Sequence, residues 1–169
     1  MSELSRFHTA QADPHAGFEA ALRELRAGRK RGHWIWYIFP QLAGLGSSPM
    51  AAAFGLRGVE EARAYLDDPV LRARLVAVVA AVADHLHREP QTRLGQIMGS
   101  AIDARKVVSS LTLFRDVATR VSERVTDDYA RLTADADAIL AAAAADGLGE
   151  CEFTKNVLSI GATMNNGYP

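Results

Sequence analysis

The sequence predicts an all-α protein, a compact single domain of about seven short helices. Several segments carry apolar residues three and four positions apart, the spacing that places side chains on one face of a helix. Capping residues, prolines or glycines bound these segments, and such residues commonly begin or end helices. The chain has 169 residues, 49% of them hydrophobic and 23% charged, which is typical of one folded domain. We therefore expect one helical core.

The first predicted helix begins at Pro14, after the capping residue Asp13, and carries Phe18, Ala21, Leu22 and Leu25 at three- and four-residue spacing. Gly28 ends it, with basic residues beside the negative end of the helix dipole. Residues 33–41 read HWIWYIFPQ and are almost continuously bulky and apolar, so we expect them to be buried. Their pattern does not decide between helix and strand.

The same signals predict the remaining helices. Asp67, Asp68 and Pro69 indicate the start of a helix at residues 70–87, which carry the broadest apolar stripe and are expected to form a central core helix. The end of the chain is rich in glycine and asparagine, so residues 148–169 are predicted to be a partly disordered C-terminal extension of a domain at residues 1–147. Four further helices are expected at residues 48–54, begun by Ser48 and Pro49, and at 59–66, 92–98 and 103–118. Another is expected to begin at Thr126 with Asp127 and Asp128. The last is expected over 138–145, preceded by Thr133, Asp135 and Asp137 and ended by Gly147.

The net charge and the cysteine content limit the partners and the cellular compartment that we expect for this protein. The formal net charge is −1 and the pI is near 6.5, so the chain lacks the positive field with which many proteins gather nucleic acid, and nucleic acid is not an expected partner. Cys151 alone can form neither an internal disulfide nor a structural zinc site, which favours a reducing, cytoplasmic compartment. The N-terminus lacks the apolar core of a secretory signal, and no stretch approaches the roughly 20 apolar residues of a membrane span.

Motifs for common cofactors and metals are absent from the sequence. We find no glycine-rich dinucleotide or phosphate motif, no nucleophile elbow and no zinc-protease motif, so no cofactor is expected. His85 and His87 are two positions apart on a predicted helix and therefore point to different sides. They are not expected to share a metal ion.

Two polar clusters, far apart in the sequence, are candidates for a binding site. His33 opens the aromatic run, where burial would set its pKa and tautomer, as suits a general base or a ligand contact. The alternative, and the more common case, is a histidine hydrogen-bonded at the edge of the core. Trp34 and Trp36 offer stacking surfaces, although tryptophans in such a run belong more often to the core.

The second cluster lies on the predicted helix at residues 103–118. Asp103 and Lys106 are three positions apart and Ser110 follows one turn later, so the three share one strip of the helix. Such a strip suits an anion, and a lysine beside a hydroxyl can activate that hydroxyl as a nucleophile. The alternative is an exposed ion pair of little energetic value, beside small hydroxyls that let helices approach.

The segments that carry both clusters resemble those of a known family, the bacterial domain of unknown function 1810 family. Some of its members are labelled calpastatin-like. The resemblance extends to about Ala145 and implies a compact, mostly helical fold without an established activity. The matching strings are RF and AQ at 6–7 and 10–11, ELRAGRKRGHWIWYIFPQLAGLGSSP at 24–49, EARAYL at 61–66, and D-x-x-K-x-x-S-S-x-T-L-F at 103–114. The polar residues that match the family pattern are Arg29, Lys30, Arg31, His33, Gln41, Asp103, Lys106, Ser109, Ser110 and Thr112.

The leading hypothesis is a pocket that binds a small anionic or nucleotide-like ligand. Apolar walls with a few polar groups are typical of ligand sites, and lysine with hydroxyls suits phosphate. His33 and Lys106 are the candidates for catalysis, should the site also hydrolyse its ligand. The residues expected to contact the ligand are Trp34 and Trp36 as walls, with Gln41, Asp103, Ser109, Ser110 and Thr112.

The competing hypothesis is a protein-interaction or inhibitor-like module. Residues 23–31 contain Arg23, Arg26, Arg29, Lys30 and Arg31, a basic face that would suit an acidic partner. A solvated helix face that complements the helix dipole explains the same residues. A third interpretation treats every matched residue as structural. The sequence indicates no oligomeric state.

Overall fold

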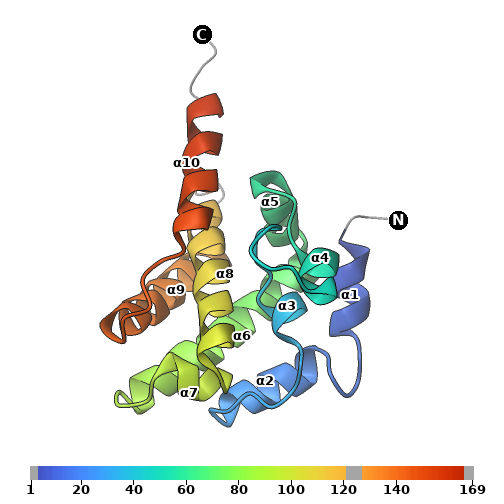
Figure 1. The fold of residues 1–169 in the computed structure, drawn as a ribbon. Coiled ribbons are helices and arrows are strands. Elements are labelled where there is room, and N and C mark those ends of the chain that lie inside the picture. Colours follow the sequence, from blue (N-terminus) through green and yellow to red (C-terminus); the bar gives the residue numbers. More distant parts are fainter. Residues whose placement is uncertain (1–3, 121–126, 166–169) are drawn as a thin grey trace.

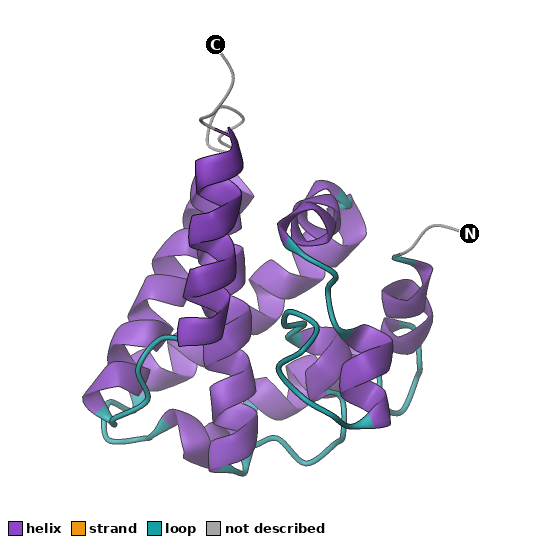
Figure 2. Ribbon diagram, turned by 45° about the horizontal axis from the view of Figure 1, so that its top comes forward, coloured by secondary structure: helices purple, strands orange, loops and turns teal. Residues whose placement is uncertain are grey.

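The structure is a computed structural model that describes residues 4–120 and 127–165, and it confirms the all-α class (Figure 2). No strand occurs in these ranges, where Leu42 and Leu56 form an isolated parallel bridge. None of the helices described there is long and apolar enough to cross a lipid bilayer. The ranges contain ten helices rather than about seven: α1 (Ser5–Gln11), α2 (Phe18–Arg26), α3 (Ile35–Ile38), α4 (Pro49–Phe54), α5 (Val59–Asp67), α6 (Pro69–Arg88), α7 (Leu94–Met98), α8 (Ala101–Arg120), α9 (Asp127–Ala145) and α10 (Glu152–Asn165).

Helix α8 runs through the middle of the fold (Figure 1). All eight side chains from residue 107 to residue 114 are buried, as expected for a helix that others enclose on every side. Helices α5, α7, α9 and α10 all contact it, and α6 packs along α9. The sequence predicted α6 as a central core helix, and α6 does bury a broad apolar face, while α8 lies at the centre of the fold.

The N-terminal helix α1 was not predicted, since the sequence indicated no helix before residue 13. Phe7 is fully buried and meets Tyr65 edge-to-face, with ring centroids 5.2 Å apart. The Nε2 of Gln11 donates to the carbonyl oxygen of Tyr37 at 2.7 Å and to the hydroxyl of Tyr65 at 3.0 Å. A helix of seven residues is too short to be stable alone, so these tertiary contacts decide its conformation.

Helix α2 begins later than predicted. Asp13 instead caps a turn before it, where Oδ1 accepts hydrogen bonds from the amides of His15 and Ala16, both at 2.8 Å. Gly28 follows the end of the helix, as predicted, with φ +73°. A Cβ atom on Gly28 would lie 2.2 Å from the ring of His85. Glycine is therefore required both for the backbone turn and for the close contact between α2 and α6.

The aromatic run at residues 33–41 forms the four-residue helix α3 and the short segment that follows it. As expected, most of the run is buried, although His33 is exposed and Trp36 is half-buried. After the helix, the amide of Leu56 donates to the carbonyl oxygen of Gln41 at 2.9 Å, and the amide of Ala43 donates to the carbonyl oxygen of Leu56 at 2.8 Å. This pairing ties the run to the start of α5.

The predicted caps of α4 and α6 are confirmed. Ser48 Oγ accepts a hydrogen bond from the amide of Ala51 at 3.1 Å, and a proline follows at the first helical position. Asp68 Oδ1 accepts from the amides of Val70 and Leu71, both at 3.0 Å. Asp68 Oδ2 also lies 2.8 Å from His8 Nε2, so Asp68 joins α1 to α6 in addition to capping α6.

The C-terminal part has longer helices than the sequence suggested. Thr133, Asp135 and Asp137 indicated a new helix start, but α9 continues through them for 19 residues. Thr133 Oγ1 donates to the carbonyl oxygen of Tyr129 at 2.9 Å, which accommodates a capping residue inside a helix. Thr126, predicted to begin the preceding helix, lies outside the described residues.

Helix α10 lies in the region where we expected a partly disordered extension. Thr154 is fully buried and Leu158 is 5% exposed, because α10 contacts α8 and α5. The helix projects from the rest of the fold beyond these contacts (Figure 1). The apolar positions that anchor it are too few to be recognised as a core-facing stripe in the sequence.

Candidate functional site

A pocket of about 500 Å³, called here the α8 pocket, lies between the first turns of α8, the loop before α4 and the side chain of Trp36. Four of the predicted site residues line it, namely Trp36, Gln41, Lys106 and Ser109. The two sequence-distant clusters therefore contribute to one cavity. The rest of the lining consists of Leu45, Gly46, Ser47, Ser48, Ala51, Ile102 and Arg105.

Asp103 connects the two clusters through two lysines. Its Oδ2 lies 2.8 Å from the Nζ of Lys30, and its Oδ1 lies 3.0 Å from the Nζ of Lys106. The side chain of Lys30 is only 8% exposed and that of Asp103 only 17%, so water and salt screen the pair less than on an open surface. Burial opposes ionisation of Asp103, but the hydrogen bonds and charges of the two lysines outweigh it and lower the pKa of the carboxyl group.

Glu24 shapes the loop that brings Lys30 to α8. Its Oε2 accepts hydrogen bonds from the backbone amides of residues 31 and 32, at 2.7 and 2.9 Å, and from the indole of Trp34 at 2.9 Å. Burial disfavours the charged form of Glu24, but these donors outweigh it and lower its pKa. The amide of Lys30 donates to the carbonyl oxygen of Ile97 at 2.7 Å. The loop is therefore attached to both α2 and α7.

The lining of the α8 pocket is electropositive. It contains Arg105 and Lys106, and none of the described residues that line it is acidic. The Nζ of Lys106 lies 4.3 Å from the centre of the Trp36 ring, a cation–π contact that helps to hold the ammonium group in place. Gln41 and the serines add neutral hydrogen-bonding groups. This arrangement suits a negatively charged ligand.

Cys151 lies against Ser109, one of the lining residues. Burial disfavours its thiolate form, but the polar groups around the sulfur, among them the hydroxyl of Ser109 and the amides of Phe153 and Thr154, outweigh burial and lower the pKa of the thiol. The hydroxyl of Ser109 itself donates to the carbonyl oxygen of Arg105 at 3.0 Å.

The remaining predicted residues do not line the pocket. Trp34 is fully buried, so Trp36 alone forms the aromatic wall. Ser110 and Thr112 are 0% and 1% exposed, and Thr112 Oγ1 donates to the carbonyl oxygen of Val108 at 2.7 Å. Neighbouring residues on a helix point about 100° apart, so Ser109 faces the pocket while Ser110 faces the core. His33 is exposed. Asp103 does not line the pocket but pairs with Lys106, which does.

Sequence reasoning missed four contributors to the site. Lys30 was noted in the basic segment and among the residues that match the family pattern, but it was not placed at the site. The loop at residues 45–48 lies in the same string, which continues through it to Pro49. Arg105 had no signal beyond its position beside Lys106. Cys151 was considered only for disulfides and zinc, and its contact with Ser109 follows from the packing of α10 on α8.

Comparison with known proteins agrees with the resemblance inferred from the motifs. The family model "Protein of unknown function (DUF1810)" matches residues 1–140. The chain belongs to the DUF1810 family. It is similar to the conserved hypothetical protein Rv1873 from Mycobacterium tuberculosis, known from a crystal structure, with 39% sequence identity, a TM-score of 0.73, and coverage of 93% of this chain and 96% of that one. No curated protein matches it.

The family match includes the whole of the α8 pocket. Its lining residues lie between Trp36 and Ser109, well inside the matched range of residues 1–140. Cys151 and α10 lie beyond that range. The chemistry that the pocket supports follows from its own residues.

Proposed function

We propose that the α8 pocket binds a small anionic ligand, of a nucleotide-like kind that joins an apolar ring to a phosphate or carboxylate group. The observation that carries this proposal is the lining, which has two cations, a tryptophan wall and no acidic side chain among the described residues. A volume of about 500 Å³ lies in the usual range for small-molecule sites. The charge selects an anion, and the wall selects an apolar body.

Lys106 is held in place before any ligand arrives. Asp103 accepts one of its hydrogen bonds and Trp36 lies under its ammonium group. An ammonium group has three N–H donors, so two remain for a ligand. Because the side chain is already ordered, binding needs less loss of conformational entropy than binding to a free surface lysine would. Asp103 and Lys30 are positioning residues in this proposal.

Hydrolysis has weaker support than binding. A general base has to come within hydrogen-bond reach of its proton, whereas His33 is exposed and does not line the pocket. Lys106, as an ammonium group paired with a carboxylate, would stabilise negative charge rather than accept a proton. We therefore propose a binding site and assign no catalytic residue.

Thermal-shift measurements test the binding proposal. AMP, ATP, ribose 5-phosphate and inorganic phosphate serve as anionic probes, and adenosine serves as the uncharged comparison. At about 100 times its dissociation constant, a ligand of the folded state stabilises it by about 2.7 kcal/mol, which corresponds to a rise in Tm of about 5 to 10 °C for a chain of this length. We expect such a rise with at least one anion and none with adenosine.

The variant Lys106→Gln should lose the thermal shift. Lys155→Gln is the matched control, because Lys155 also pairs with an acidic residue three positions earlier, at 3.0 Å, but lies on α10 away from the pocket. The control should keep the full shift. If no anion stabilises the wild type, or if Lys106→Gln responds as the wild type does, the proposal is wrong.

A second candidate function is interaction with an acidic protein through residues 23–31. The observation that favours it is that Arg23, Arg26, Arg29 and Arg31 are all exposed, whereas Lys30 is engaged with Asp103. Positive charges exposed on one surface attract an acidic partner and orient it.

A further inference from the structure

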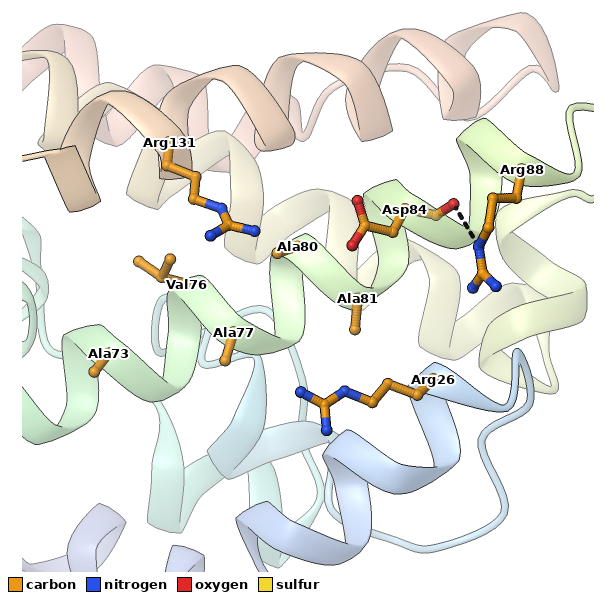
Figure 3. Close-up of a pocket in the computed structure, with 9 residues that line it drawn as sticks. All are labelled: Arg26, Ala73, Val76, Ala77, Ala80, Ala81, Asp84, Arg88 and Arg131. Atoms are coloured by element: carbon orange, nitrogen blue, oxygen red, sulfur yellow. Dashed lines mark hydrogen bonds between the residues drawn. The ribbon is translucent and has the colours of Figure 1, made fainter.

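Helix α6 borders a second hollow, about 360 Å³ in volume, which we call the α6 groove (Figure 3). The α6 residues that line it are spaced three or four positions apart, so they form one continuous face of the helix. From the first to the last of them this face is about 22 Å long, at 1.5 Å per residue. The lining consists of Ala73, Val76, Ala77, Ala80, Ala81, Asp84 and Arg88, with Arg26 from α2 and Arg131 from α9.

The floor of the groove is apolar and consists of small side chains. Four of its members are alanines and the fifth is Val76, and Ala77 is only half-buried although α6 contacts both α2 and α9. Small side chains allow another backbone to come close, which is how small-residue helix faces pack at short interaxial distances. A face of about four turns with such a floor allows a second helix to lie along it.

Three guanidinium groups border this floor. Arg26 and Arg131 extend from opposite sides of α6, and Arg88 lies near the C-terminal end of the face (Figure 3). Arg26 has no ion-pair partner among the described residues, and Arg131 reaches Asp135 only at 3.7 Å with 62% of its side chain exposed. Asp84 is the single acidic residue of the lining. The lining therefore has three arginines against one aspartate, and when Asp135, the partner of Arg131, is included, an excess of one positive charge remains.

We propose that the α6 groove docks a helical segment of an acidic partner protein. The small face of that helix would lie on the alanines, and its carboxylates would pair with Arg26 and Arg131. The proposal deepens the second candidate function and rests on it, because Arg26 belongs to both surfaces. It is independent of the α8 pocket, with which the groove shares no lining residue.

A labelled synthetic peptide tests the groove by fluorescence anisotropy. The probe is a 21-residue helical peptide with alanines on one face and glutamates flanking them, and a version with glutamine in place of glutamate is the neutral control. We expect the full-length protein to bind the acidic peptide and not the neutral one. The variant Arg26→Glu with Arg131→Gln should weaken binding by about tenfold or more, as expected for loss of charge complementarity.

Two further variants separate the groove from the wider basic surface. Ala77→Phe fills the floor and should also weaken binding by about tenfold, while Ala134→Phe, at an exposed position of α9 outside the lining, should leave it unchanged. Arg29→Glu with Arg31→Glu should change binding by less than about threefold, since both residues lie outside the groove. Thermal melts of each variant verify that it folds.

The outcomes distinguish the groove from the candidate function on which it rests. If the peptide binds and only the Arg29 and Arg31 variant weakens it, the basic-segment interaction stands and the groove proposal is overturned. If the wild type binds no acidic peptide, both are overturned. Equal binding of unstructured poly-glutamate or of single-stranded DNA would show that the arginines attract any polyanion, and would overturn the assignment of a helix.

Discussion

The α8 pocket and the α6 groove both present more cations than carboxylates, but they hold those cations differently. In the pocket, Lys106 is 20% exposed and is fixed by Asp103 and by the ring of Trp36. In the groove, Arg26 is exposed and Arg131 has one distant carboxylate neighbour. An ordered cation favours one ligand geometry, whereas an unrestrained arginine can adapt to a larger partner. We infer that a ligand of the pocket has to fit cations held in fixed positions, whereas a partner of the groove meets arginines that can adjust to it.

The largest expected effect concerns the framework behind the pocket. Trp34→Ala should lower the free energy of unfolding by about 3 to 5 kcal/mol, because it removes a fully buried indole. It also removes a hydrogen-bond donor to Glu24. Trp36→Ala should cost only about 1 kcal/mol, since Trp36 is half-buried. Urea unfolding measures both, and equal losses would contradict the distinction between a core tryptophan and a pocket wall.

The two regions differ again in how much they depend on their aspartates. Asp103→Asn should lower stability by about 2 kcal/mol, because it leaves the nearly buried Lys30 without its carboxylate. Asp84→Asn in the groove should change stability by less than about 0.5 kcal/mol, since Asp84 is exposed. The comparison uses the same substitution and the same denaturant assay. Equal costs would show that the Lys30–Asp103–Lys106 cluster does not fix the pocket.

The pH dependence of stability should report the same cluster. The pKa of Asp103 is lowered from 3.8 in the folded protein, so the unfolded chain binds more protons near that pH. The stabilisation by Asp103 is therefore fully present above the unfolded pKa and is lost as the pH falls through the lower folded pKa. Urea midpoints of the wild type and Asp103→Asn should converge at low pH. A constant difference down to pH 2 would contradict this linkage.

The smallest expected effect uses Cys151 as a reporter beside the pocket. Its pKa is lowered from 9.0, so the pH midpoint of iodoacetamide alkylation should be lower in the folded protein than in urea. Ser109→Ala should raise that midpoint slightly, because it removes one of the polar groups around the sulfur while the two amides remain. Substitution of Arg26 in the distant groove should leave it unchanged. Mass spectrometry follows the reaction, and a folded midpoint at or above the unfolded one would refute the prediction.

The fold class and several boundaries were predictable because they depend on local chemistry. Caps at Ser48 and Asp68 and the glycine after α2 follow from interactions within a few residues of each other. Helix α1 and helix α10 were not predicted, since their stability depends on contacts with α3, α5 and α8. The four-residue helix α3 is too short to show any period.

The candidate site was predictable in composition but not in orientation. The two clusters identified in the sequence do meet, and Asp103 joins them through Lys30 and Lys106. Ser109 and Ser110 are equivalent in the sequence pattern, whereas the packing of α8 exposes the first to the pocket and buries the second in the core. Likewise, Trp34 and Trp36 have the same chemistry but lie on different sides of one turn.

The amino-acid sequence by itself determined that the chain is helical, where several of the helices begin and end, and which polar residues are gathered in its motifs. These properties depend on neighbours along the chain, which any reader of the sequence can see. Only the tertiary structure decided which of those residues share a cavity, and that α6 leaves a basic groove uncovered. Side-chain direction on a packed helix depends on residues distant in sequence, whose positions no local pattern specifies.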